Sequence, residues 1–335
     1  MSLDARGRDA REEFLQRDIL PLYFPPAAAE DAPDFVLLTG QPGAGRMRAA
    51  LPAGLGGVAV VNVDELQAFH PEFMRLHSTG SPVALNELAQ TAAGWVSGCT
   101  RFARENGRSV VLDGVFPDSA VAATAAEAFA AAGFSTRVVF VASRRVESLL
   151  SVASAYLQDV RSHRGGVIVT REAHDAGLDA TRRLAASLDD AAWADRVTVV
   201  SRGGQVVFDA HRQVNEPASF RGVGPALEAG QSGRMSRWDA TQWLSEVHRV
   251  TDYATSLRVM PDGVAELLVD LHESALREVI PELYIPADGK FHSAIEQRTR
   301  TRLAELRAWL HPAQAVDAAA PVLAPDAAEL GGLSR

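Results

Sequence analysis

The sequence has one cysteine, no excess of positive charge and no long apolar run. Cys99 cannot form an intramolecular disulfide, so a reducing compartment is the simpler setting. The 33 lysine and arginine residues face 42 aspartate and glutamate residues, and the formal net charge of −9 argues against a broad surface for nucleic acid. No stretch of about 18 apolar residues predicts a membrane span, and the charged start "MSLDARGRDAREEF" lacks the apolar core of a signal peptide. We therefore expect a cytoplasmic protein that binds neither nucleic acid nor membrane.

Valine-rich apolar runs alternate with amphipathic stretches over the first 200 residues. The runs predict strands at 35–39, 58–64, 109–114, 136–142 and 196–201. Helical patterns lie between them at about 84–106, 118–132, 144–160 and 171–189. This alternation predicts the α/β class, with a parallel sheet flanked by helices, and a further strand at 203–210 that pairs as a hairpin.

The pattern changes after residue 212. Residues 213–236 have no sustained period and are interpreted as a linker. Residues 237–312 have helical periodicity and predict an all-helical C-terminal domain of about three helices. The Ala- and Pro-rich residues 313–335 are expected to be disordered. The core aromatics of the helical domain are expected to be Trp238, Trp243, Tyr253 and Trp309.

A glycine-rich turn follows the first predicted strand, in "FVLLTGQPGAGRMRAAL" (residues 35–51). Gly40 and Gly45 have the spacing of the phosphate-binding pattern G-x-x-x-x-G-K-[ST]. Such a turn directs backbone N–H groups toward an anion, and the following helix adds its positive end. The alternative is a glycine turn that only joins a strand to a helix. The candidate nucleotide-binding residues are Gly40, Gln41, Pro42, Gly43, Ala44, Gly45, Arg46 and Met47.

Two positions of the loop depart from this pattern. Arg46 stands at the lysine position, where it keeps the positive charge but carries it on a longer, planar group. Met47 stands at the Ser/Thr position, and a thioether is a poor ligand for Mg²⁺. Pro52 is expected to cut the following helix short.

Three later segments accompany the loop: "NVDELQAFHPEF", "LDGVFPD" and "YLQDVRSHRGGVIVTREAHDAGLDATRRLAASL". In order and spacing, the loop and these segments resemble the zeta toxin family of bacterial toxin–antitoxin kinases over about residues 10–212. The resemblance implies a P-loop NTPase-type kinase domain over residues 1–212. It also implies the use of ATP with Mg²⁺ and phosphorylation of the sugar of UDP-N-acetylglucosamine.

The resemblance further implies roles for acidic residues. Asp64 stands where the family has its general base, which would deprotonate the acceptor hydroxyl while Arg46 binds the phosphates. The alternative for Asp64 is an ordinary helix N-cap. Asp113 occupies the place of a substrate-binding glutamate and, with Glu65, is a candidate for acceptor binding. The alternative for Asp113 is a solvated turn at the end of a strand.

The arginines that the family uses to neutralise the transferring phosphate are missing from their usual places. Ala155 precedes Tyr156, and Ile168 and Val169 stand before Thr170. Nearby arginines either replace them as lid arginines or lie as solvated charges on a loop. These candidates are Arg161, Arg164 and Arg171.

These residues are compatible with two functions. One is ATP-dependent phosphoryl transfer to a nucleotide sugar such as UDP-N-acetylglucosamine or to another small hydroxyl acceptor, as in the related chloramphenicol phosphotransferase. The other is a catalytically impaired pseudokinase that binds nucleotide or a protein partner without turnover. Because zeta toxins are held inactive by small three-helix antitoxins, an antitoxin-like protein is a candidate partner. The C-terminal helices are then either a cis-acting cover over the site or a bundle that stabilises the core.

Overall fold

We analysed a computed structural model of the chain, which describes residues 10–79, 81–162, 167–189, 191–212, 220–283, 285 and 289–311. The described residues form one six-stranded sheet in the order β2-β3-β1-β4-β5-β6. The strands are β1 (Asp34–Thr39), β2 (Ala59–Asn62), β3 (Val110–Gly114), β4 (Ser135–Ala142), β5 (Arg196–Ser201) and β6 (Val206–His211). Every pairing is parallel except that of β5 with β6, which is antiparallel. The predicted α/β class and the predicted hairpin strand are therefore confirmed.

Alternate side chains of β1 enter different cores, as the pleat of a strand requires. Phe35 and Leu37 pack in a large cluster with the helices of one face. Val36 and Leu38 pack on the other face in a smaller cluster. Burial on both faces explains why the strands are continuous valine-rich runs.

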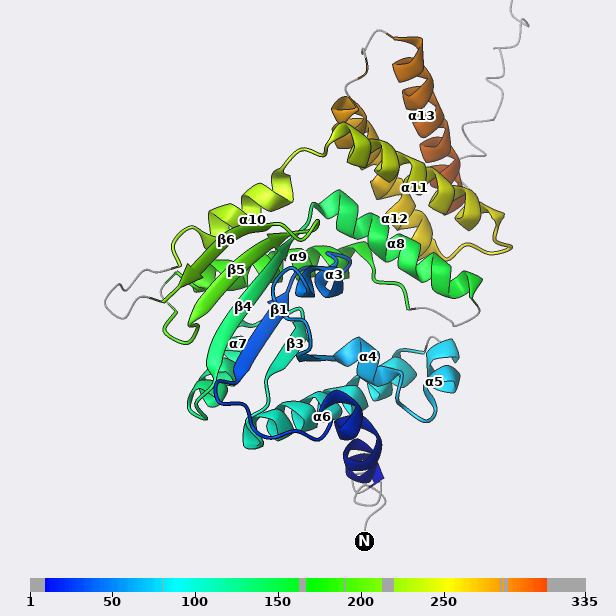
Figure 1. Cartoon of the computed structure of the whole chain (residues 1–335). Helices are drawn as coiled ribbons and strands as arrows, with labels where there is room; N and C mark the ends of the chain where they lie inside the picture. The colour runs from blue at the N-terminus through cyan, green and yellow to red at the C-terminus, as the bar shows by residue number, and fades with distance from the viewer. Residues whose placement is uncertain are drawn as a thin grey trace, which may run out of the picture.

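The helices of the sheet domain surround these strands (Figure 1). They are η1 (Leu15–Ile19), α2 (Leu20–Tyr23), α3 (Arg46–Ala50), α4 (Val63–Gln67), α5 (Phe73–Thr79), α6 (Pro82–Glu105), α7 (Ser119–Ala130), α8 (Arg145–Arg161), α9 (Arg171–Ser187) and α10 (Val223–Ser232). Central β1 pairs with β3 on one side and β4 on the other, so the chain reverses its direction of winding at β1. In open α/β sheets, ligands bind at the carboxyl ends of the strands beside such a switch point.

Part of the interval 213–236, which the sequence predicts as a linker, is helical. Helix α10 lies in it, and Phe220, Val223 and Leu227 are buried in the large sheet-domain cluster. A ten-residue helix with one apolar face and several small glycine or alanine positions gives a weak periodic signal, which explains why the pattern is hard to detect. The described part of this interval therefore packs with the sheet domain.

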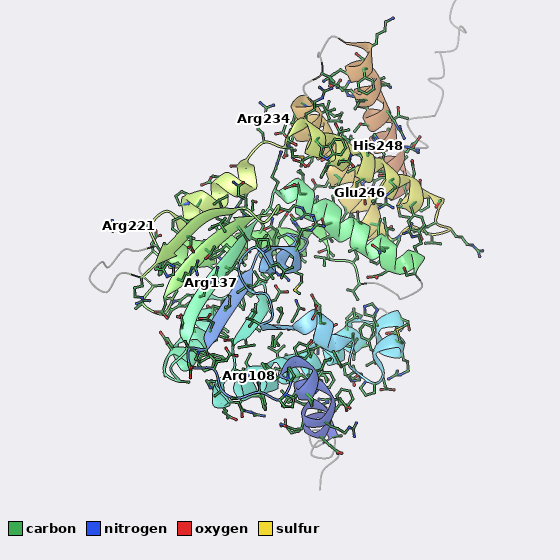
Figure 2. The ribbon with its side chains drawn as sticks, viewed as in Figure 1. Arg108, Arg137, Arg221, Arg234, Glu246 and His248 are labelled. Atoms are coloured by element: carbon green, nitrogen blue, oxygen red, sulfur yellow. The ribbon has the colours of Figure 1, made fainter. Side chains whose placement is uncertain are left out.

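The C-terminal helices pack on α8. They are α11 (Arg237–Ser256), α12 (Asp262–Ser274), η2 (Ala275–Val279), η3 (Ile280–Glu282) and α13 (Lys290–Leu310). Figure 1 shows α8 beside α11 and α12, and apolar side chains of these helices share one core. Glu246 of α11, labelled in Figure 2, accepts a 2.8 Å hydrogen bond from Ser154 of α8. The predicted tail at 313–335 lies outside the described residues.

The predicted set of core aromatics is partly wrong. Trp243 is buried, and its Nε1 donates a 3.0 Å hydrogen bond to the Val146 carbonyl of α8. Tyr253 packs against the same core. Trp238 and Trp309 are instead 70% and 43% exposed, because the periodic pattern does not show which helix face meets α8. No helix of the described chain is long and apolar enough to cross a membrane.

Candidate functional site

The glycine-rich turn lies between β1 and α3 and touches α8. Gly43 and Gly45 have φ values of 77° and 89°, a left-handed conformation that favours glycine. A Cβ on Gly43 would lie 2.2 Å from the Ser148 carbonyl oxygen, so only glycine fits there. The turn is thus held in shape by α8 as well as by its own backbone.

The backbone of the turn leaves hydrogen-bond donors available. The Ala44 amide donates to the Gln41 carbonyl at 3.0 Å, whereas the Gly43 and Gly45 amides donate to none of the described residues. The short helix α3 ends at Ala50, two residues before Pro52, as predicted. Open amides at a turn and a helix start favour an anion.

The side chains of the turn point in different directions. Gln41 and Ala44 are fully buried, and Gln41 Nε2 donates to the Ser143 carbonyl at 2.7 Å and to Ser148 Oγ at 3.2 Å. Met47 is 48% exposed. Among these nucleotide-binding candidates, Gln41 and Ala44 therefore shape the turn, and contact with phosphate would come from its backbone.

Arg46 joins the turn to the end of β3. Its Nε donates to Asp113 Oδ1 at 2.5 Å, and its Nη1 donates to the Gly40 carbonyl at 2.9 Å. The Asp113 side chain is only 2% exposed, and its second oxygen accepts a hydrogen bond from Asn62 Nδ2. Asp113 is therefore a buried, paired carboxylate, and the alternative of a solvated turn is wrong.

Asn62 is a site residue that sequence reasoning missed. Its Oδ1 accepts from the amides of Asp64 at 2.7 Å and Glu65 at 3.4 Å, which makes Asn62 the N-cap of α4. The alternative that Asp64 is an N-cap is therefore wrong. The asparagine directly before "VDEL" is the signal that could have shown it, since asparagine is a preferred N-cap.

The turn opens onto a pocket of about 490 Å³ at the carboxyl ends of β1 and β3. Asp64 lies in its lining with an exposed side chain, and it forms no ion pair with any described residue. The described lining residues are Pro42, Gly43, Arg46, Asn62, Val63, Asp64, Asp113, Gly114, Val115, Ser151, Val152, Ala155, Tyr156, Asp159, Val167 and Val169. The structure thus brings the loop, Arg46, Asp64 and Asp113 together in one cavity.

Glu65 stands apart from this lining. It follows Asp64 on α4, and its charge acts on Tyr23, whose pKa is raised to about 12 mainly by burial and then by Glu65. Burial, together with the charges of Asp113 and Asp64, raises the pKa of Glu65 itself. Burial is the main cause of both pKa shifts, and the neighbouring carboxylates add to them.

The predicted lid arginines do not reach the pocket where the structure describes them. Arg161 lines a separate small cavity with Arg249 and Tyr253, and Arg171 pairs with the adjacent Glu172 at 2.9 Å on the surface. Arg164 lies outside the described residues. Arg161 and Arg171 therefore fit the alternative of solvated or outward-facing charges.

Arg202 is a second residue that sequence reasoning missed. It follows β5, and its Nη1 donates to the Gly43 carbonyl at 2.7 Å while its Nη2 donates to Ser151 Oγ at 2.6 Å. It thus connects the turn to α8, and burial lowers its pKa. A lone arginine before "GG" carries no motif, so the sequence could not reveal this contact.

The buried His174 connects the turn to the C-terminal helices. Its Nε2 lies 2.9 Å from Ser148 Oγ, and its Nδ1 lies 3.0 Å from Asp175 Oδ1. Asp175 binds Arg145, which also binds Asp270 of α12 at 2.6 Å. Burial lowers the pKa of His174, which favours the neutral ring. This chain of contacts indicates a packing role for His174 and Asp175.

The described side chains do not form a magnesium site by themselves. Both Asp113 oxygens accept hydrogen bonds, from Arg46 and Asn62. Met47 offers a thioether, a poor ligand for this cation. The described part of the chain contains no group of three or more His, Cys, Asp or Glu side chains arranged for a metal.

A family comparison agrees with this geometry. The model of the zeta toxin family matches residues 25–213, which is more than half of the chain. The chain belongs to the zeta toxin family. The match contains the glycine turn, Asp64, Asp113 and His174, and it ends after β6, so the C-terminal helices of this zeta toxin family member lie beyond it. No curated protein matches the sequence significantly.

Solved structures share the fold at low sequence identity. A structure of the PezAT chromosomal toxin–antitoxin system of Streptococcus pneumoniae is 17% identical, covers 73% of this chain and 96% of that chain, and has a TM-score of 0.61. The AvrRxo1-ORF1:-ORF2 complex with ATP is 12% identical, covers 79% of this chain and 89% of that chain, and has a TM-score of 0.50. At these identities the two structures show a shared fold.

Proposed function

We propose that this zeta toxin family member binds ATP at the glycine turn and transfers its terminal phosphoryl group to a hydroxyl group of a small acceptor. The observation that carries the proposal is the shared pocket, in which the open turn and Arg46 face Asp64. Family membership supports the reaction type, and UDP-N-acetylglucosamine is the acceptor that the resemblance implies. The AvrRxo1-ORF1:-ORF2 complex, which has a similar fold, was solved with ATP, and this supports the choice of nucleotide.

Each residue has a physical task in this reaction. The Gly43 and Gly45 amides donate hydrogen bonds to phosphate oxygens, and Arg46 adds a positive charge beside them. Asp64, at the start of α4, accepts the proton of the acceptor hydroxyl. The hydroxyl oxygen bonds to the terminal phosphorus while the bond from this phosphorus to ADP breaks, and ADP leaves. Asp113 and Asn62 hold Arg46 and α4 in place. No step depends on a protein-bound metal, because the described side chains do not form a magnesium site by themselves.

A pseudokinase is the second candidate, and the contacts of Arg46 favour it. The guanidinium binds Asp113 and the Gly40 carbonyl, so reaching a phosphate requires giving up part of these hydrogen bonds. Phosphoryl transfer depends on positioned charge, and loss of a single such contact lowers rates strongly. As a pseudokinase, the protein would bind nucleotide at the turn without transferring a phosphoryl group.

An antitoxin-like protein is a further proposed partner, which rests on family membership and on the toxin–antitoxin system among the similar structures. The C-terminal helices are a poor candidate for a cis-acting cover. No described residue beyond position 236 lines the pocket, and these helices meet it only through Val152, Tyr156 and Val169, which line the pocket and also pack in the core of the C-terminal helices. These contacts favour the interpretation that the C-terminal helices form a bundle that stabilises the core.

Release of ADP from ATP and Mg²⁺ tests the proposed function. The full chain is incubated with UDP-N-acetylglucosamine or with a small-molecule extract of bacterial cells, and products are identified by mass spectrometry. We expect Asp64→Asn to lower turnover by about 10²- to 10⁴-fold, as loss of a general base does. Calorimetry should show that Asp64→Asn binds the ATP analogue AMP-PNP as tightly as the unaltered chain does. The control variant is Asp31→Asn, in the exposed loop before β1, which should change neither turnover nor AMP-PNP binding.

The same assay separates the two candidates. Binding of AMP-PNP without ADP release, with turnover appearing only in the variant Arg46→Lys with Met47→Thr, supports the pseudokinase. If the full chain binds no adenine or uridine di- or triphosphate, both candidates are wrong.

A further inference from the structure

The positive charge of Arg46 is balanced within the site. Its Nε binds Asp113, and the Asp113 side chain is only 2% exposed. The ion pair as a whole carries no net charge, so it adds little to the potential that a phosphate meets at the turn. In the phosphate-binding pattern, a lysine reaches the β- and γ-phosphates. A group other than Arg46 is therefore needed to give this turn a net positive charge.

Arg202 contacts the same turn and has no carboxylate partner among the described residues. Its guanidinium donates to three uncharged acceptors: the Gly43 carbonyl at 2.7 Å, Ser151 Oγ at 2.6 Å and Ser143 Oγ at 3.4 Å. The charge of Glu147 acts on Arg202, but the two side chains form no ion pair. A cation that is partly removed from water without a counter-ion is costly, and an anionic ligand would supply the missing charge.

The backbone around Arg202 fixes its position beside the turn. The Arg202 amide donates to the Ala142 carbonyl at the end of β4 at 2.9 Å. The turn between β5 and β6 then packs behind α3, because a Cβ on Gly204 would lie only 2.6 Å from Pro52 Cγ. A Cβ on Gly45 would lie 3.8 Å from Arg202 Nη1. The guanidinium therefore lies next to Gly45, whose amide is one of the open donors of the turn.

We propose that Arg202 supplies the net positive charge that holds the phosphates of the nucleotide at the turn, in place of the lysine of the loop pattern. This inference rests on the proposed function, because it assigns a binding residue to the same nucleotide site. Its basis is electrostatic, since a cation without a counter-ion beside open amides attracts a polyanion. Arg202 can do so without breaking an ion pair, whereas Arg46 would have to leave Asp113.

Inorganic tripolyphosphate tests this charge without a base or a sugar. The full-length protein is titrated by calorimetry with tripolyphosphate and, separately, with AMP-PNP. We expect Arg202→Gln to weaken the binding of both ligands by about tenfold or more, because it removes the charge but keeps a donor for the Gly43 carbonyl. Arg202→Lys, which keeps the charge, should recover most of this loss. Raising the salt concentration should narrow the difference between the unaltered chain and Arg202→Gln, because salt screens the interaction.

Two control variants separate Arg202 from the other charges near the turn. Arg48→Gln removes an exposed arginine of α3 whose charge also acts on Arg202, and it should weaken tripolyphosphate binding by no more than about threefold, because solvent screens it. Arg46→Gln combined with Asp113→Asn removes a cation and an anion together. This combined variant should lose less affinity for tripolyphosphate than Arg202→Gln does, and a larger loss would mean that Arg46 is the phosphate-binding cation and would overturn the proposal.

A second readout uses the unaltered chain and does not depend on whether Arg202→Gln folds. In protein labelled with ¹⁵N-arginine, the Nε–H signal of Arg202 is identified by its absence from Arg202→Lys. We expect this signal to shift when tripolyphosphate is added, and an unchanged signal at saturation would overturn the proposal.

Three further results would also decide against Arg202. The proposal is wrong if Arg202→Gln binds tripolyphosphate as tightly as the unaltered chain does. It is equally wrong if Arg202→Lys is as weak as Arg202→Gln at an unchanged melting temperature, because charge would then not be the cause. Loss of AMP-PNP binding with tripolyphosphate binding retained would assign Arg202 to the base or the sugar instead. If the unaltered chain binds neither ligand, the proposed function itself is wrong, and this inference fails with it.

Discussion

At the residue scale, Arg46 and Asp113 form an ion pair whose side chains are 15% and 2% exposed. Removing one member of such a pair leaves a charge in a place where water cannot solvate it, which costs about 3–5 kcal/mol. We expect Arg46→Ala to lower the free energy of unfolding by about 3 kcal/mol in urea titrations. Adding Asp113→Asn to this variant should recover much of the loss, because it removes the uncompensated charge.

The double-mutant cycle supplies the control. Each single variant and the double variant are measured under the same conditions. If the two losses simply add, the contact between Arg46 and Asp113 does not contribute to stability in solution. Arg46 would then be free to bind phosphate at no cost, and the main observation in favour of the pseudokinase would disappear.

Local patterns predicted part of the site. The glycine turn and the position of Asp64 after a buried strand follow from the sequence, because a strand, a turn and a helix are local features. The N-cap role of Asn62 was a local signal that was overlooked, whereas its contact with Asp113 and the contact of Arg202 with Gly43 join residues that are distant in the sequence. No spacing rule links such residues before the sheet order is known.

At the element scale, one buried carboxylate joins three segments. Glu282, at the end of η3, binds Arg144 before α8 at 2.5 Å and accepts from the Met235 amide before α11 at 3.2 Å. Glu282 and Arg144 are 6% and 8% exposed. The carboxylate therefore fixes how the C-terminal helices meet the sheet domain.

We expect Glu282→Gln to lower the free energy of unfolding by about 2–4 kcal/mol, because it leaves Arg144 without its closest partner. The matched control is Glu278→Gln. Glu278 is also near Arg144, at 3.6 Å, but its side chain is 35% exposed, so its loss should cost less than about 1 kcal/mol. Similar effects in both variants, measured by urea unfolding, would contradict the assigned role of Glu282.

The order of strands and helices along the sheet domain could be predicted from the sequence. Which of these elements pack against one another could not. Valine-rich runs and amphipathic periods indicated the strands and the long helices. The helix α10 was missed because its burial depends on a groove formed by α9, β4 and β5. Burial of that kind is a tertiary property that a ten-residue window does not contain.

At the scale of the whole molecule, α8 belongs to the sheet domain and to the core of the C-terminal helices. Val146, Leu149, Leu150 and Leu157 of α8 are buried in that core with residues of α11 and α12. Deleting residues 237–335 would expose this face, and an exposed apolar patch of several large side chains promotes aggregation. We expect the truncated chain to be insoluble or to bind the dye ANS.

The full chain should unfold in one cooperative thermal transition, because the two units share α8 and its core. Calorimetry checks this by comparing the measured enthalpy with the van't Hoff enthalpy. Deleting only 313–335 is the matched control, since the sequence predicts a disordered tail there, and it should leave the melting temperature unchanged. A soluble, folded and toxic product of the longer deletion would instead show that the C-terminal helices act as an inhibitor in cis.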